Sequence, residues 1–136
     1  MVDFNELYRN ADPAPVRVGL VGVGEFGASL ITQSLNHSGI DVPVVADRDT
    51  DRAVNVLLRC GVKGEAIEIC RDGNAAQAAM AAGKVAVLPD GHSVVGTDVE
   101  VLVEATGAPD AAAAVSEAAI LAGKHVVLAT KEAAAI

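Results

Sequence analysis

The sequence predicts an α/β fold with a mostly parallel sheet that carries helices on both faces. Three observations lead to this prediction. Short runs rich in Val and Ile alternate with longer stretches that repeat apolar residues at helical spacing. The short runs are continuously apolar, as expected for strands buried on both faces of a parallel sheet with right-handed crossovers. The first run passes directly into a glycine-rich turn at residues 22–27, where a strand would give way to a helix.

The apolar runs define the expected strands. Five of them are predicted as strands, and residues 66–70 form a further, less regular extended candidate. The predicted strands are residues 16–21, 42–46, 85–88, 99–105 and 125–129. Pro, Asp and Gly at residues 89–91 predict a turn after the third of these strands.

Helical patterns fill the intervals between the strands. The predicted helices are residues 25–36, 50–60, 75–82 and 110–122. A glycine directly follows each of the last three ranges, which is a common way for a helix to end. Asp49 or Thr50 would cap the second helix and Asn74 the third, because short polar side chains accept from the free N–H groups of the first turn.

Residues 1–15 are expected to precede the domain as a lead-in. Phe4, Leu7 and Tyr8 are spaced like one face of a short helix, and the prolines that follow would end it. Residues 16–136 would then form one domain, since 136 residues are enough for a single core.

Charge and composition narrow the classes of partner. The formal net charge of −8 and the isoelectric point of about 4.7 disfavour nucleic acids and anionic membranes. Hydrophobic residues make up 51% of the chain and aromatic residues only 2%, so the core must come from Val, Ala, Leu and Ile. No secretory leader or membrane-spanning run is visible, and Cys60 and Cys70 lack metal-ligand spacing. We therefore expect a cytoplasmic protein with reduced thiols and no metal site.

The turn Gly22-Val23-Gly24-Glu25-Phe26-Gly27 has the spacing G-x-G-x-x-G. Gly22 would permit a positive φ, Gly24 would let a pyrophosphate approach the backbone, and Gly27 would let the next helix pack close to the strand. The free N–H groups and the dipole of that helix would face the phosphates. Strand, glycine turn, helix, strand and acid, in this order, predict a Rossmann-type dinucleotide-binding unit.

The acid is Asp47, which stands twenty residues after Gly27 at the tip of the second predicted strand. A carboxylate there accepts hydrogen bonds from the adenosine ribose hydroxyls, which favours NAD. Arg48 follows directly, and a guanidinium there can pair with the 2′-phosphate of NADP. The choice between NAD and NADP therefore stays open. The alternative for Asp47 is a solvated loop acid or a helix cap, although Asp49 is better placed to cap.

Two segments in the second half of the chain resemble a known family. Residues 103–107, VEATG, and residues 122–127, AGKHVV, resemble the cofactor domain of homoserine dehydrogenases. Residues 79–87, AMAAGKVAV, look closer to their relatives with a C-terminal SAF domain, which include a reductoisomerase-like enzyme and sugar-acid enzymes. The resemblance covers the chain from about residue 16 onward and implies an NAD(P)-dependent oxidoreductase that acts on a small hydroxy or carbonyl substrate.

The resemblance also implies roles for individual residues. The pyrophosphate would be held by Gly22, Gly24, Glu25, Phe26 and Gly27. The adenosine ribose would be held by Asp47 and Arg48, and the nicotinamide ribose would pass alongside Ala105, Thr106 and Gly107. Because the carboxyl ends of parallel strands share one edge of the sheet, we expect these segments and residues 130–132 to form one cluster.

Lys131 is the candidate for contact with the substrate. It matches a lysine that homoserine dehydrogenases place near the nicotinamide, where it would orient a substrate oxygen or a cofactor phosphate. Thr130 stands where the family has Asn, and Glu132 follows. A surface lysine at a helix start is the alternative reading. His92, placed in the predicted turn, has no second catalytic group beside it in a known pattern.

Members of the family continue into a substrate and oligomerisation domain that this chain does not include. Hydride transfer needs a substrate held against the nicotinamide and a positioned proton donor or acceptor. We therefore expect the 136-residue chain to bind cofactor with little turnover, and robust turnover by the purified chain would contradict this. An apolar face left uncovered would favour a homo-oligomer. The alternative function is a nucleotide-sensing regulatory module without catalysis.

Overall fold

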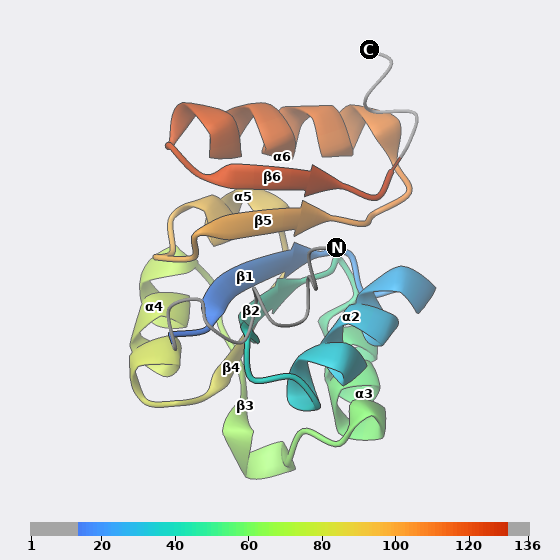
Figure 1. The fold of residues 1–136 in the computed structure, drawn as a ribbon, viewed down its shortest axis with the longest axis vertical. Coiled ribbons are helices and arrows are strands. Elements are labelled where there is room, and N and C mark those ends of the chain that lie inside the picture. Colours follow the sequence, from blue (N-terminus) through green and yellow to red (C-terminus); the bar gives the residue numbers. More distant parts are fainter. Residues whose placement is uncertain (1–13, 131–136) are drawn as a thin grey trace, which may run out of the picture.

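The computed structural model describes residues 14–130, which form one six-stranded sheet with helices on both faces (Figure 1). The strand order is β3-β4-β2-β1-β5-β6, and every neighbouring pair is parallel. The strands are β1 (Val16–Val21), β2 (Ile40–Ala46), β3 (Ile67–Ile69), β4 (Val85–Leu88), β5 (Val101–Glu104) and β6 (His125–Leu128). The predicted α/β, doubly wound, parallel architecture is confirmed.

Five α-helices connect the described strands. They are α2 (Glu25–Leu35), α3 (Thr50–Cys60), α4 (Gly73–Ala81), α5 (Gly91–Val95) and α6 (Pro109–Leu121), with a short 3-10 helix at Gly64–Ala66. Helices α2 and α3 cover one face of the sheet, while α4, α5 and α6 cover the other (Figure 1). Successive residues of a strand point to opposite faces, so each central strand contributes to both layers.

Two apolar clusters make up the core, one on each face. Under α2 and α3, Leu20 packs with Ile31 and Leu57. Under α4, α5 and α6, Leu102 packs with Val94 and Val115. Aliphatic side chains dominate both clusters, as the small aromatic content requires.

Strand β2 is longer than predicted and contains a proline. It begins at Ile40, and its register with β1 shifts between the pairs Arg17↔Asp41 and Gly19↔Val44. Two residues of β2, Val42 and Pro43, therefore lie opposite the single residue Val18 of β1, which is the signature of a bulge. The bulge accommodates Pro43, which has no N–H to donate to a neighbouring strand.

Four other elements differ from the prediction. Residues 66–70 contribute only the short edge strand β3, and the predicted turn at residues 89–91 opens a one-turn helix, α5. Helix α4 begins at Gly73, because Asp72 rather than Asn74 accepts from the N–H of Ala75, at 2.9 Å. The strand expected over residues 99–105 is regular only from residue 101 to 104, although the N–H of Ala105 still donates to Val21.

Some predictions concern residues outside 14–130 or are untested. The apolar face at Phe4, Leu7 and Tyr8 lies outside the described residues, and the division into a lead-in and a domain stays a prediction. Within the described range, every helix is too short or too polar to cross a membrane. Cys60 and Cys70 are both free thiols.

Truncation of Leu20 should show how much the central strand contributes to stability. Leu20 is fully buried, and removal of such a side chain costs about 2–5 kcal/mol. We expect Leu20→Ala to lower the free energy of unfolding by this amount in urea denaturation. Leu121→Ala is the matched control, since Leu121 is 80% exposed and its truncation should change stability by less than about 0.5 kcal/mol. Equal effects at the two sites would contradict this account of the core.

Candidate functional site

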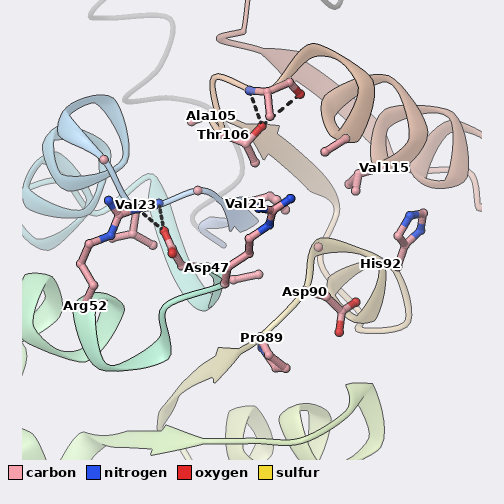
Figure 2. A pocket seen from close by; sticks show the side chains of 17 residues that line it. Val21, Val23, Asp47, Arg52, Pro89, Asp90, His92, Ala105, Thr106 and Val115 are labelled. Carbon is pink, nitrogen blue, oxygen red and sulfur yellow. Dashed lines mark hydrogen bonds and ion pairs between the residues drawn. The ribbon is translucent and has the colours of Figure 1, made fainter.

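A cavity of about 450 Å³ opens at the carboxyl edge of the sheet, where β1 lies between β2 and β5. This is the point at which the strand order reverses, and open parallel sheets bind ligands in the crevice there. Its walls come from the segments that follow β1, β2, β4 and β5 and from α6 (Figure 2). The volume lies within the range of small-molecule sites.

Two glycines of the turn bring three backbone segments into contact. Gly22 has φ +95°, and a Cβ there would lie 2.6 Å from the carbonyl carbon and oxygen of Ala105. A Cβ on Gly27 would lie 2.5 Å from the carbonyl oxygen of Gly22. Real Cβ atoms do not approach other atoms so closely. The end of β1, the exit of β5 and the first turn of α2 therefore pack backbone to backbone.

Gly24 differs from the other two glycines of the turn. No atom lies within 4 Å of the position that its Cβ would take, and the residue lines the cavity. Gly24 is also the N-cap of α2 and supplies no side-chain hydrogen bond. By contrast, aspartates at positions 49, 72 and 90 cap α3, α4 and α5. The first N–H groups of α2 are thus left for an external acceptor, which is the property of an anion-binding helix end.

Asp47 lies at the other side of the glycine turn, immediately after β2. One carboxylate oxygen, Oδ2, accepts from the backbone N–H of Val23 at 3.0 Å and from Arg52 Nη2 at 2.6 Å. The other, Oδ1, accepts from the N–H of Asp49 at 3.0 Å. Figure 2 shows Asp47 pointing between Val23 and Arg52. The side chain is only 8% exposed, so Asp47 is a satisfied, nearly buried acid rather than a solvated loop residue.

The same contacts set the protonation of Asp47. Burial by itself raises the pKa of the carboxyl, but the hydrogen bond from Arg52 and those from the backbone of Asp49 and Val23 outweigh burial. The net result is a pKa below the ordinary value of 3.8. Asp47 is therefore ionised at neutral pH and acts as an acceptor only.

The segment after β4 forms a third wall. Pro89, Asp90 and His92 line the cavity (Figure 2). Asp90 is held in place as the N-cap of α5, since its carboxylate accepts from the backbone N–H and the hydroxyl of Ser93 at 2.9 Å each. His92 belongs to α5 and not to a turn, and it is exposed at the cavity wall.

The exit of β5 is positioned by a fully buried carboxyl group. Glu104 is 0% exposed, and its Oε1 accepts from the N–H of Thr106 at 2.7 Å and from the Thr106 hydroxyl at 2.5 Å. Among the described residues its Oε2 has no hydrogen-bond partner. One residue further on, the N–H of Gly107 donates to the buried hydroxyl of Thr130 at 2.9 Å, which ties this loop to the end of β6.

The structure brings together six of the predicted site residues at the cavity. These lining residues are Gly22, Gly24, Asp47, Arg48, Ala105 and Thr106. Glu25 and Phe26 are exposed in the first turn of α2, Gly27 is buried beneath the turn, and Gly107 lies beside the cavity without lining it. Lys131 and Glu132 lie outside the described residues. The binding roles of all these residues stay predictions.

Sequence reasoning missed Arg52 and the wall after β4. Arg52 lines the cavity from the first turn of α3 and pairs with Asp47. Two signals were available in the sequence. The segment after residues 85–88 had to reach the same edge as the other strand ends, and an arginine five residues after Asp47 falls in the first turn of the next helix. Within residues 14–130, no three His, Cys, Asp or Glu side chains gather as they would for a metal ion.

Comparison with known proteins supports the fold but does not assign the chain to a family. The sequence matches no protein-family model and no curated protein. Among solved structures, the chain is similar to myo-inositol dehydrogenase from Lactobacillus casei in complex with NAD(H) and myo-inositol. The TM-score is 0.60 at 19% sequence identity, over 84% of this chain and 28% of that one. The chain therefore has the Rossmann-type fold seen in that dehydrogenase and corresponds to about a quarter of its length.

The contacts of Asp47 predict a pH-dependent contribution to stability. Because its pKa is lowered on folding, the contribution is present above the unfolded-state value, about 3.9, and is lost as pH falls through the lower folded-state value. We expect Asp47→Asn to lower the urea midpoint at about pH 7 and to differ less from wild type at about pH 3. Asp41→Asn, at an exposed acid early in β2, is the control and should change stability little at either pH. A pH-independent loss in Asp47→Asn would refute the assignment.

Proposed function

We propose that residues 16–136 form the dinucleotide-binding domain of an NAD(P)-dependent oxidoreductase. The observation that carries the proposal is the uncapped N-terminus of α2 above an open cavity, at the one glycine of the turn that has free space around its Cβ position. A pyrophosphate needs this combination, since it must approach backbone N–H groups without meeting a side chain.

Each part of the dinucleotide would contact a different wall of the cavity. The N–H groups at Gly24 and the start of α2 would bind the pyrophosphate. Asp47 and Arg48 would bind the adenosine ribose on the β2 side of β1, and Ala105 and Thr106 would lie along the nicotinamide ribose on the β5 side. The nicotinamide itself would supply hydride chemistry, and the residues described here would bind and orient it.

The family resemblance and the similar solved structure support an oxidoreductase, but they do not single out one substrate. The VEATG and AGKHVV segments are similar to homoserine dehydrogenases and their relatives with a SAF domain. The similar solved structure is a dehydrogenase with NAD(H) and a small polyol bound. We therefore propose a cytoplasmic enzyme that acts on a small hydroxy or carbonyl compound, with a further domain that supplies the substrate pocket and contacts between subunits. Residues 16–136 alone would bind cofactor with little turnover.

Nucleotide titration tests the proposal directly. We expect saturable binding of NADH or NADPH, measured as the change in fluorescence of the nucleotide. Gly24→Ala should weaken this binding by about tenfold or more, because a methyl group would occupy the phosphate approach, equivalent to about 1.4 kcal/mol. Its unfolding transition should stay close to that of wild type, since the added Cβ meets no atom within 4 Å.

The matched control is Gly64→Ala, in the 3-10 helix outside the cavity wall. Its Cβ would make one ordinary contact, 3.8 Å from Leu58 Cδ2, so binding and stability should both be retained. Failure of the wild-type chain to bind either nucleotide would overturn the proposed function. Unchanged binding in Gly24→Ala would overturn the placement of the pyrophosphate.

A further inference from the structure

The formal positive charge of the cavity wall is gathered at one end. Arg48 and Arg52 are the arginines that line it, and both follow β2 within the segment 47–52. Under the proposed function this is the end that receives the adenosine ribose. The acids in the same segment are Asp47, which pairs with Arg52, Asp49, which caps α3, and the exposed Asp51.

Asp47 has little capacity left for a ribose. A carboxylate offers about four acceptor positions. Three are taken by the N–H of Val23, the N–H of Asp49 and Arg52 Nη2. The one position left, on Oδ1, lets Asp47 accept from one ribose hydroxyl while Arg52 stays in place.

Arg52, by contrast, has donors to spare. A guanidinium carries five N–H groups, and one of its nitrogens is engaged with Asp47. The side chain is 54% exposed and stands at the wall of the cavity. A 2′-phosphate presents three strong acceptor oxygens and up to two negative charges, which suits a fork of guanidinium donors. If Arg52 turned away, Asp47 would keep its two backbone donors.

We propose that Arg52 is a specificity-determining residue that lets this domain accept both NAD(H) and NADP(H). Arg52 stays beside Asp47 when the ribose carries a free 2′-hydroxyl and turns to the phosphate when NADP(H) binds, with Arg48 on the same wall. The paired arginine offsets the charge of Asp47, which would otherwise repel a 2′-phosphate. This inference rests on the proposed function and names the nucleotides that the site accepts.

The test is a parallel titration with NADH and NADPH of wild type, Arg52→Gln and a control. Wild type should bind the two nucleotides within about tenfold of each other. Arg52→Gln should raise the Kd for NADPH by about tenfold or more and change that for NADH by less than about threefold. Arg59→Gln, the same change in the last turn of α3, should alter neither. Added salt should weaken NADPH binding more than NADH binding.

Other outcomes separate this inference from the proposed function. If wild type binds NADH but its Kd for NADPH is more than about a hundredfold higher, the inference is overturned and the proposed function stands. An equal loss of affinity for both nucleotides in Arg52→Gln would also overturn the inference. It would indicate that Arg52 only stabilises the glycine turn through its ion pair with Asp47. Arg52→Lys should restore part of the NADPH affinity, since it keeps the charge without the fork. Binding of neither nucleotide would overturn both.

Discussion

The carboxyl edge of the sheet depends on backbone contacts that leave no room for side chains. At Gly22 the turn meets the exit of β5, and at Gly27 the first turn of α2 meets the turn itself. Any Cβ at either position would push one of these segments away. The contacts hold α2 so that its uncapped N-terminus stands over the crevice between β2 and β5. The geometry of the cavity is thus a consequence of chain packing at two positions.

The Asp47 carboxylate completes this arrangement electrostatically. It links the turn at Val23, the start of the segment after β2 at Asp49, and α3 through Arg52. A protein with a net charge of −8 thereby presents N–H groups and guanidinium groups to the interior of one cavity. Net charge governs encounters over long distances, whereas binding of an anion is decided by the donors within hydrogen-bond reach.

The fold was predictable to the extent that single segments carry their own signals. Apolar runs, helical periodicity and the glycine spacing predicted β1, α2, α3 and the parallel sheet, because these depend on local pattern. Edge strand β3 was predicted only as a less regular extended candidate and α5 only as a turn, since elements so short carry almost no periodicity. The strand predicted over residues 42–46 already included Pro43, but the bulge opposite β1 that accommodates this proline is visible only in the structure.

The candidate site was predictable in position but not in its pairing. The sequence placed Gly24, Asp47 and Thr106 at strand ends, and the structure brings them to one cavity. It did not indicate that Arg52 would form an ion pair with Asp47, or that the buried Glu104 would accept a hydrogen bond from the N–H of Thr106. Such pairings depend on how far a helix start lies from a strand end and on which rotamers the packing allows. Those quantities are set by the assembled fold and not by neighbouring residues.

One end of the cavity is built from main-chain groups and the other from side chains, so the two ends differ in how freely they tolerate substitutions. The end proposed to bind the pyrophosphate consists of main-chain N–H groups held by Gly22 and Gly27, so few substitutions there are compatible with the fold. The opposite end consists of the exposed side chains of Arg48 and Arg52, which the core does not require. Under the proposed function, natural variation or directed evolution would therefore alter the preferred nucleotide through one or two codons in this segment. The scaffold that binds the part common to all dinucleotides would be left untouched.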